Sequence, residues 1–457
     1  MTQDRDIVVI GCGAGGGTAS QFARKIDRKS TITIFEKNKY PQYSKCGLPF
    51  VVSGVISDFK NLIEFNEEWF KKANIDLILE ANVNKIDIKK EMIYAKQNDI
   101  TIEKSFKKLI ICTGAKSFIP PIENINIKGV FTVRTIDDTK KILAYSKNLK
   151  KATIIGAGLI GLEIADNLRQ NGLQVTIVET LQNILANNLD EDMSKIVLEK
   201  IPCDISIYTN HTAKKVEQKD GKITKVIIKN KENNEEKYIE TDILIIATGT
   251  KPDTMLARSI GCKIGITGGI LVNEKSETTV KDVYAVGDCT EYIDYVTKKP
   301  LLAGLGSVAV RQGIAAGVNS AGGEYNLPMG FLNTNTSKFF NLDIAAVGPI
   351  SIRIDNEFSV ISARYNGSSL PDYYPGGKPI SIKVLVDEYT GIIMGAQAVG
   401  ENAAQRINTI ACAILARLDI DTYRKLETAY APPIAPTLDA ETLVCDIAFM
   451  KIAQKKR

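Results

Sequence analysis

The sequence contains a single histidine among its 457 residues, and its eight cysteines stand too far apart to form a C-x-x-C pair. Without clustered cysteines we expect neither a disulfide framework nor a structural zinc site, and we predict no metal cofactor. The histidine, His211, lies in the polar stretch YTNHTAKK, so we expect it on the surface. A mechanism that needs a histidine acid or base elsewhere therefore has no candidate. The cysteines are at positions 12, 46, 112, 203, 262, 289, 412 and 445.

Long apolar runs are also missing, so no segment is predicted to span a membrane. The chain reaches a strand-like run, DIVVI, with no signal peptide before it, and we expect a cytoplasmic protein. The formal net charge of +5 is small for this length, and the lysines are spread along the chain. Neither nucleic acid nor a membrane is therefore an expected partner. The length predicts two or three domains.

A glycine-rich motif follows the first predicted strand. DIVVI runs into GCGAGG, in which Gly11, Gly13 and Gly16 fit G-x-G-x-x-G before a helical pattern. Glycines at these places allow a tight turn and let backbone N–H groups approach a pyrophosphate at the helix N-terminus. The next strand, STITIFE, ends in Glu36, and a carboxylate there accepts hydrogen bonds from a ribose. Strand, loop, helix and acid together predict a dinucleotide site.

The same pattern occurs a second time. Gly156, Gly158 and Gly161 lie in KKATIIGAGLIGLEIADNL, and the following strand, QVTIVE, ends in Glu179. A domain copied only for structural reasons would not need an acid on its second strand, so we favour two bound dinucleotides. The carboxylate of Glu179 would repel a 2′-phosphate, and no arginine follows it directly, which favours NADH over NADPH at this second site.

Two further stretches resemble each other. LIICTGAKSFIPPI contains Thr113 and Gly114, and LIIATGTKPD repeats the buried strand that ends in Thr-Gly. Such an end lets the backbone approach a ligand closely. In VYAVGDCTE, Gly287 and Asp288 end a later strand, from which the carboxylate can reach a polyol chain.

In combination these motifs resemble the FAD-dependent pyridine nucleotide–disulfide oxidoreductases along nearly the whole chain. The resemblance includes GCGAGG with Glu36, both Thr-Gly strands, GAGLIGLE and VYAVGDC. It implies that FAD occupies the first site, that NADH or NADPH occupies the second, and that Asp288 contacts the ribityl chain of the flavin. A segment from about Phe331 resembles the dimerisation domain of the family, so we expect a homodimer.

Sulfur chemistry selects a branch of this family. Members similar to glutathione reductase carry two cysteines four residues apart and a C-terminal histidine, and this chain has neither. Its SKCGLPF, with Cys46, is similar to the single-cysteine branch, which includes coenzyme A disulfide reductase, NADH oxidase and NADH peroxidase. The oxidases and peroxidases of this branch place a histidine in the first glycine-loop region. This chain has no histidine there.

The coenzyme A disulfide branch uses tyrosines instead. Its Tyr-Ala-Pro-Pro is present from Tyr430, and its Tyr-Tyr-Pro-Gly as Tyr373, Tyr374, Pro375 and Gly376. The resemblance implies that the second subunit supplies such tyrosines to the active site, where a phenol can hydrogen-bond a thiolate. The alternative is that they are interface aromatics without a chemical role.

The expected activity is reduction of a small disulfide by NAD(P)H through FAD and a mixed disulfide on Cys46. Glu163 resembles the family residue near the nicotinamide, although it could equally have a structural partner. The alternative activity is an NADH oxidase that reduces oxygen through a sulfenic acid on Cys46. A further alternative is a redox-sensing flavoprotein in which Cys46 is structural.

The chain departs from the coenzyme A disulfide reductases beside the thiol. Lys45 and Gln42 stand where that branch has asparagine and serine. Lys45 could lower the pKa of the thiol, meet an anionic substrate or point into solvent. Thr18, Arg24 and Lys25 align with a region that holds coenzyme A phosphates in the family, so coenzyme A is a candidate substrate or bound thiol. The departures also leave room for polysulfide or a persulfide.

The predicted fold is α/β, with two Rossmann-like domains for FAD and NAD(P)H and a C-terminal α+β dimerisation domain. The expected boundaries are 1–150 for the first part of the FAD domain, 151–270 for the NAD(P)H domain, 271–325 for the second part of the FAD domain and 326–457 for the dimerisation domain.

Overall fold

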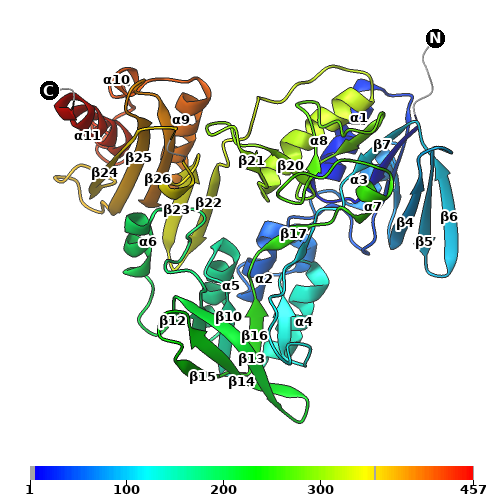
Figure 1. Ribbon diagram of the computed structural model, residues 1–457, viewed down its shortest axis with the longest axis horizontal. Coiled ribbons are helices and arrows are strands. Elements are labelled where there is room, and N and C mark those ends of the chain that lie inside the picture. The colour runs from blue at the N-terminus through cyan, green and yellow to red at the C-terminus, as the bar shows by residue number, and fades with distance from the viewer. Residues whose placement is uncertain (1–5, 355–356, 456–457) are drawn as a thin grey trace. The chain divides into compact units, whose positions relative to one another are not determined.

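The computed structural model describes residues 6–354 and 357–455 (Figure 1). The chain forms two compact units. The first unit contains the chain up to residue 118, with residues 134–139 and 250–331. The second unit contains residues 119–133, 140–249 and 332 onward. Helix α4 (Ile136–Ser146) includes residues of both. These divisions follow compactness alone, so the assignment of 1–150, 151–270, 271–325 and 326–457 to functional domains stays a prediction.

A parallel sheet with the order β19-β7-β1-β2-β3 forms the centre of the first unit. Its strands are rich in isoleucine and valine on both faces, as expected where both faces are covered. Helices α1 (Ala14–Ile26) and α8 (Gly306–Ser320) lie side by side, and a Cβ atom on Gly317 would overlap the backbone oxygen of Ala19. The strands are β1 (Asp6–Ile10), β2 (Thr31–Phe35), β3 (Asp76–Ile78), β7 (Lys108–Ile111) and β19 (Val283–Ala285).

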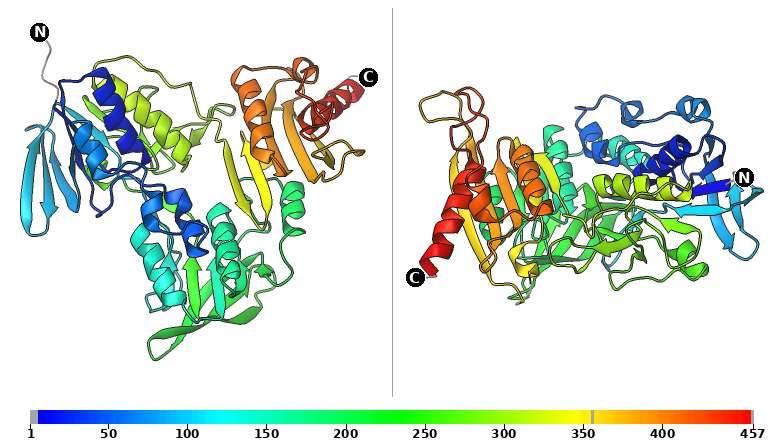
Figure 2. Two further views of the ribbon diagram at one scale, coloured as in Figure 1. Left: turned by 180° about the vertical axis from the view of Figure 1, so that it is seen from behind. Right: turned by 90° about the horizontal axis from the view of Figure 1, so that it is seen from above.

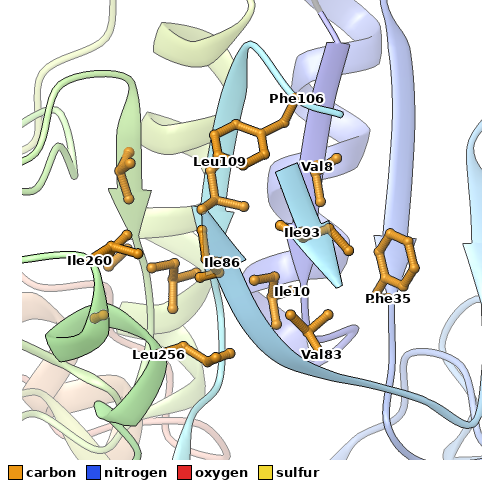
Figure 3. Packing of buried hydrophobic residues seen from close by; sticks show 14 of the residues in the cluster. Val8, Ile10, Phe35, Val83, Ile86, Ile93, Phe106, Leu109, Leu256 and Ile260 are labelled. Atoms are coloured by element: carbon orange, nitrogen blue, oxygen red, sulfur yellow. The ribbon is translucent and has the colours of Figure 1, made fainter. Parts of the chain in front are cut away.

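One apolar core of this unit lies between the parallel sheet and an antiparallel sheet of β4 (Ala81–Asp87), β5 (Met92–Gln97) and β6 (Ile100–Ser105). Figure 3 shows Val8 and Leu109 of the parallel sheet in the same cluster as Ile86 and Ile93. Each fully buried side chain of this size stabilises the fold by roughly 1.5–3 kcal/mol. The core holds β1 and β7 rigidly, and with them the loops at their carboxyl ends.

The remaining elements of the first unit are short. A ribbon joins β8 (Ala115–Ser117) to β17 (Thr250–Pro252), and a small sheet contains β18 (Ile270–Leu271), β20 (Thr290–Ile293) and β21 (Pro300–Leu301). The helical segments are η1 (Lys45–Gly47), α2 (Leu48–Val52), η2 (Phe59–Leu62), α3 (Glu67–Lys72) and α7 (Met255–Ser259).

The second unit repeats the parallel architecture in a sheet with the order β12-β11-β10-β16-β9. Helix α5 (Leu159–Gln170) packs against β10 and β11, and an antiparallel sheet of three strands completes this part. The parallel strands are β9 (Val130–Thr132), β10 (Lys151–Ile155), β11 (Gln174–Val178), β12 (Ser206–Tyr208) and β16 (Ile243–Ile246); the antiparallel ones are β13 (His211–Lys219), β14 (Lys222–Asn230) and β15 (Glu236–Glu240).

The C-terminal part of the second unit is an antiparallel sheet with the order β22-β23-β26-β25-β24. Helix α9 (Ala403–Leu415) contacts β23 and β26, and helix α11 (Ala440–Lys455) contacts β24 and β25 (orange to red in Figure 2). The predicted combination of two Rossmann-like sheets and an α+β domain is confirmed. The other elements are β22 (Asn335–Phe339), β23 (Leu342–Val347), η3 (Ser351–Arg353), β24 (Val360–Ser368), β25 (Pro379–Asp387), β26 (Ile393–Gly400), α6 (Glu191–Leu198) and α10 (Ile420–Tyr423).

The expectation that His211 lies on the surface was wrong. His211 is the first residue of β13, and its side chain is buried. Its ring packs edge-on against Tyr208, with 5.5 Å between the ring centroids, and Nδ1 lies 2.6 Å from the carbonyl oxygen of Thr209. Packing between two strands therefore overrides the polar composition of the stretch.

Candidate active site

The first glycine loop joins β1 to α1 at the carboxyl edge of the first parallel sheet. Gly11 has φ +102°, and a Cβ atom there would overlap the carbonyl oxygen of Cys112, the residue after β7, so only glycine fits. A Cβ on Gly16 would likewise overlap the oxygen of Gly11. A Cβ on Gly13 would meet no described atom within 4 Å. Two glycines therefore close the turn, and the third leaves space in front of the α1 N-terminus for a phosphate-bearing ligand.

Glu36 is fixed beside this loop. It follows β2 directly, is buried, and accepts hydrogen bonds from the backbone N–H of Cys12 at 2.7 Å and of Asn38 at 2.9 Å. The carboxylate is thereby held next to the second residue of the loop, where an acid binds a ribose.

The second glycine loop repeats this geometry between β10 and α5. Gly156 has φ +107°, a Cβ on Gly161 would overlap the oxygen of Gly156, and Gly158 faces open space among the described residues. Glu179 accepts hydrogen bonds from the N–H groups of Ala157 and Leu181 at 2.7 and 2.8 Å. Because these bonds repeat those of Glu36, the two loops are built for the same class of ligand.

The strand ends beside the first loop bring the other expected residues to the same edge. β7 and β19 pair next to β1, which places Thr113, Gly114, Gly287 and Asp288 after neighbouring strand ends. Thr113 Oγ1 donates to the carbonyl oxygen of Asp253 at 2.5 Å. The crevice at the carboxyl ends of such strands is where open α/β sheets bind their ligands.

Arg134, which no motif in the sequence indicated, pairs with Asp288. Its guanidinium lies 2.6 Å from the carboxylate, and about a fifth of each side chain is exposed (19% and 20%). Arg134 Nε is buried and finds no hydrogen-bond partner among the described residues. Gln312 on α8 also has a buried donor without a partner. Its Oε1 accepts a hydrogen bond from the N–H of Gly287 at 2.8 Å, but its Nε2 has no hydrogen-bond partner among the described residues.

These observations fit FAD at the first site. Buried polar groups are nearly always hydrogen-bonded, so two donors without partners beside Asp288 indicate a polar ligand. The open space at Gly13 suits the pyrophosphate, and Glu36 suits the ribose of the adenosine half.

Cys46 lies in η1, immediately before the short helix α2, in the same unit as the first loop. Its side chain is exposed, whereas Cys12, Cys262 and Cys289 of this unit are buried and Cys112 is half-buried. Burial raises the pKa of Cys289 to about 11, and it also raises the pKa of Cys12 and of Cys112. Because the thiolate is the nucleophile, Cys46 is the cysteine of this unit suited to exchange with a substrate.

We expect alkylation to separate these thiols. A brief pulse of iodoacetamide on the native protein should label the exposed Cys46, Cys203 and Cys412 at least roughly tenfold faster than the buried Cys12, Cys262, Cys289 and Cys445. Peptide mass spectrometry measures the labelled fraction at each position, and labelling in denaturant supplies the reference rate. Comparable labelling of the buried group would contradict the structure.

Lys45, beside the thiol, is reached by solvent but closely surrounded by protein. This surrounding lowers the pKa of Lys45, and the positive charge of Arg134 lowers it further, while Asp288 and Glu36 act in the opposite direction. The lysine therefore belongs to the same electrostatic cluster as the Arg134–Asp288 pair.

Of the three residues expected at coenzyme A phosphates, one is buried and two have partners within the protein. Thr18 is buried in α1. The guanidinium of Arg24 donates to the carbonyl oxygens of Ala73, Asp27 and Asn74, at 2.6–3.1 Å. Lys25 Nζ lies 4.2 Å from the centre of the Phe22 ring. These contacts favour structural roles, and binding of coenzyme A here stays a prediction.

The two tyrosine motifs meet in the second unit. The hydroxyl groups of Tyr373 and Tyr430 lie 2.5 Å apart, and both side chains are exposed. The hydrogen bond with Tyr430 raises the pKa of Tyr373. Tyr374, the other tyrosine of this motif expected at the active site, lies in a turn where its N–H donates to the oxygen of Pro371 at 2.9 Å. The phenol pair is thus Tyr373 with Tyr430.

Glu163 has the structural partner that the sequence left open. Its Oε1 accepts a hydrogen bond from Ser337 Oγ at 2.5 Å, which joins α5 to β22. Burial raises the pKa of Glu163, and the bond from Ser337 opposes that rise. A role near the nicotinamide stays a prediction.

Two glycine loops, each with an acid from the next strand, together with one exposed thiol in the unit of the first loop define a redox enzyme that binds two dinucleotides. The chain belongs to the pyridine nucleotide-disulphide oxidoreductase family, whose model matches residues 5–313. The dimerisation domain of this family matches residues 334–441. The resemblance inferred from the sequence is confirmed, and the protein is an FAD-dependent NAD(P)H oxidoreductase.

Relatives cover nearly the full chain. An NADH oxidase of Methanocaldococcus jannaschii is 36% identical over an alignment of 456 residues, which covers 98% of this chain and 99% of that one. A CoA-dependent NAD(P)H sulfur oxidoreductase of Pyrococcus abyssi is 33% identical, covering 95% and 96% of the two chains. The solved structure of an NAD-dependent persulfide reductase from A. fulgidus superposes with a TM-score of 0.92 and 32% identity, over 98% of this chain and 84% of that one.

Among the described helices, none combines the length and apolar character needed to cross a bilayer. The described residues also contain no cluster of three or more His, Cys, Asp or Glu side chains arranged to hold a metal ion. The expected absence of a metal cofactor stays a prediction.

Proposed function

We propose that the protein uses NADH to reduce a small disulfide or persulfide-type sulfur substrate through Cys46. The observation that carries this proposal is the exposure of Cys46 on a helical turn in the unit of the first glycine loop, where the other cysteines are buried or half-buried. One accessible thiol without a second beside it requires a mixed disulfide with the substrate rather than an internal disulfide.

The sulfur chemistry then has two steps. The Cys46 thiolate attacks one sulfur of the substrate disulfide, the substrate S–S bond breaks, and the leaving thiolate takes a proton. Two electrons and a proton, derived from NADH and solvent, cleave the mixed disulfide to release the second thiol and regenerate the Cys46 thiolate. In sum, one disulfide, one NADH and one proton give two thiols and NAD⁺.

Residues of the first unit would hold FAD, which when bound relays two electrons between the nicotinamide and sulfur. Gly11, Gly13 and Gly16 would receive its pyrophosphate, Glu36 its ribose, and Asp288 with Arg134 its polyol chain. At the second site Gly156, Gly158 and Gly161 would receive the coenzyme pyrophosphate. Glu179 would bind the unmodified ribose of NADH and repel the 2′-phosphate of NADPH.

The tyrosine pair would contribute from the partner subunit. The dimerisation domain supports a homodimer. A phenol pair that shares one hydrogen bond retains a second proton to donate, so Tyr430 or Tyr373 would stabilise the departing thiolate.

Coenzyme A disulfide and polysulfide are the two acceptors to compare first. The relative from Pyrococcus abyssi is described as CoA-dependent, and the structure from A. fulgidus is of a persulfide reductase. Lys45, the residue before Cys46, adds a positive charge to the cluster with Arg134, which suits an anionic sulfur substrate. The expectations of a cytoplasmic location and of no nucleic-acid or membrane partner stay predictions.

Oxygen reduction is the second candidate, because the relative from Methanocaldococcus jannaschii is an NADH oxidase. It would convert Cys46 to a sulfenic acid instead of a mixed disulfide.

Anaerobic NADH consumption by the purified holoenzyme separates these candidates. With coenzyme A disulfide or polysulfide present, we expect rapid consumption, and replacing NADH with NADPH should lower kcat/KM at least about tenfold, equivalent to 1.4 kcal/mol. With coenzyme A disulfide, release of two thiols per NADH, counted with a chromogenic disulfide after removal of the protein, verifies the stoichiometry. Consumption that begins only when oxygen is admitted would overturn the disulfide proposal in favour of the oxidase.

A further inference from the structure

A nine-residue segment of the second unit, residues 184–192, connects the second nucleotide loop to the C-terminal sheet, and we name it the tether segment. Its first end contacts the glycine loop, because the N–H of Leu185 donates to the carbonyl oxygen of Ala157 at 2.9 Å. Leu185 has φ +52°, a left-handed conformation that is unfavourable for leucine, and its side chain is buried. Backbone strain of this kind persists only where surrounding contacts impose it.

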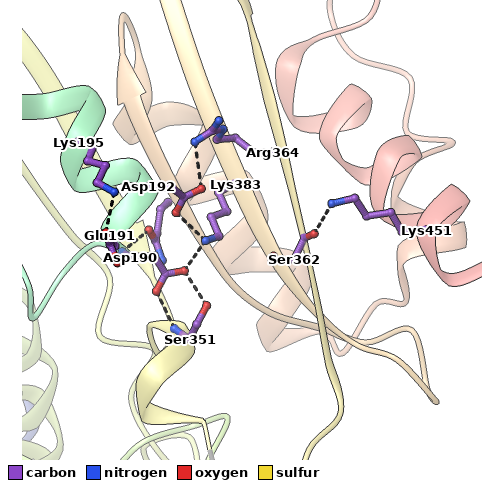
Figure 4. Close-up of polar contacts among 10 residues, drawn as sticks. Asp190, Glu191, Asp192, Lys195, Ser351, Ser362, Arg364, Lys383 and Lys451 are labelled. Carbon is purple, nitrogen blue, oxygen red and sulfur yellow. Dashed lines mark hydrogen bonds and ion pairs between the residues drawn. The ribbon is translucent and has the colours of Figure 1, made fainter. Parts of the chain in front are cut away.

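At Leu185 itself the turn is closed by hydrogen bonds from the N–H groups of Asn188 and Leu189 to its carbonyl oxygen, at 2.7 and 3.0 Å, and contacts from the C-terminal domain hold the far end of the segment. Asp190 accepts hydrogen bonds from the N–H and Oγ of Ser351 at 2.8 and 2.7 Å (Figure 4). The N–H of Asp190 donates to Gln397 Oε1 at 2.8 Å. Lys383 of β25 lies 2.8 Å from Asp190 and 2.7 Å from Asp192. The segment is thus fixed to β25, β26 and η3 at one end.

Further bonds leave little of the segment unattached. Arg353 donates to Asn187 at 2.6 Å, and Asn188 donates to Asn335 of β22 at 3.1 Å. Ser194 Oγ donates to the carbonyl oxygen of Ile184 at 2.7 Å.

The charges explain why the geometry is firm. Side-chain exposure is 10% for Lys383 and 8% for Asp190, so the pair is shielded from water. Burial acts to raise the pKa of Asp190, but hydrogen bonds from Lys383 and Ser351 outweigh it and hold the pKa below its usual value. Removing the cation would leave a buried carboxylate without its counterion, which is strongly unfavourable.

We propose that the tether segment positions the second glycine loop for NADH, so that the buried Asp190–Lys383 pair on the C-terminal domain sets the affinity for the coenzyme. This inference rests on the proposed use of the second loop by NADH. Lys383 and Asp190 touch neither nucleotide loop in the contacts described, so they are positioning residues. The hydrogen bond from Leu185 to Ala157 is the step that transmits their geometry.

The test compares Lys383→Met and Asp190→Asn with wild type in the holoenzyme. We expect the dissociation constant for NAD⁺, measured by calorimetry without an acceptor, to rise about tenfold, a change of 1.4 kcal/mol. KM for NADH should rise in parallel, while kcat and KM for the disulfide stay within about twofold. Lys383→Arg should restore most of the affinity, because it keeps the charge. Ser351→Ala removes one hydrogen bond to Asp190 and should raise the dissociation constant less. This variant tests the inference if Lys383→Met does not fold.

Lys455→Met is the matched control, because it breaks an ion pair of the same domain between the exposed Lys455 and the half-buried Glu388, 3.1 Å apart. It should leave the affinity for NAD⁺ unchanged. If Lys383→Met and Ser351→Ala lose thermal stability but bind NAD⁺ like wild type, the network is only structural and the inference is wrong. If wild type itself binds no NAD⁺, the proposed function fails instead.

Discussion

Replacing Cys46 with serine should lower NADH-dependent disulfide reduction by at least roughly 10³-fold, because loss of a nucleophile removes the covalent route altogether. A serine hydroxyl cannot form a mixed disulfide and is hardly ionised at neutral pH. The fold should survive, since Cys46 is exposed and serine is nearly isosteric. We expect the free energy of unfolding to change by less than about 0.5 kcal/mol.

The measurement is anaerobic steady-state turnover with coenzyme A disulfide, beside flavin content and thermal unfolding of each variant. Cys203→Ser is the control, because Cys203 is also exposed but lies in the second unit. Full activity of Cys46→Ser with retained flavin would show that the thiol is structural and would support the redox-sensor alternative. Loss of activity in both variants would indicate a general sensitivity to cysteine replacement.

The nucleotide loops show how far local patterns reach. Gly11, Gly16 and Glu36 were predictable because strand, turn and helix follow one another within a single stretch, and the same holds for Gly156, Gly161 and Glu179. The structure adds that each acid accepts a backbone N–H from its own loop. The sequence alone does not reveal this hydrogen bond. The order of strand, loop, helix and strand nevertheless brings the carboxylate and the loop N–H group together.

Residues that act through long-range packing were not predictable in this way. Arg134 reaches Asp288 across 154 positions of sequence, and neither TVRTIDD nor its composition distinguishes this arginine from a surface residue. The choice between Tyr373 and Tyr374 depends on a turn that directs adjacent side chains differently, and only the folded loop shows that Tyr373 meets Tyr430. In the sequence Arg24 looked available to bind a phosphate. Its guanidinium instead donates to three carbonyl oxygens, and only the folded chain shows that these oxygens lie beside it.

The second large effect is expected at the second glycine loop, where two alanine substitutions should behave oppositely. A Cβ at Gly161 would overlap the backbone oxygen of Gly156, which cannot rotate away as a side chain would. Alanine is the better helix former by about 1 kcal/mol. Overpacking against a fixed group costs up to about 3 kcal/mol, so the clash dominates. Gly161→Ala should therefore lower the free energy of unfolding and weaken NAD⁺ binding together.

Gly158→Ala should separate binding from stability. Its φ of −79° is acceptable to alanine, and a Cβ there would meet no described atom within 4 Å. Alanine is a poorer N-cap than glycine by no more than about 1 kcal/mol, so the protein should stay folded. The added methyl group would occupy the space in which backbone N–H groups approach the pyrophosphate. We expect the dissociation constant for NAD⁺ to rise at least about tenfold.

Calorimetric titration with NAD⁺ and denaturant unfolding of both variants give the two quantities. A Gly158→Ala protein that binds NAD⁺ as tightly as wild type would place the coenzyme elsewhere, whatever Gly161→Ala does. Equal losses of stability in the two variants would show that both glycines serve packing. We expect Gly158→Ala to lose binding alone and Gly161→Ala to lose both binding and stability. This pattern arises only if a ligand fills the space that the closed turn leaves open.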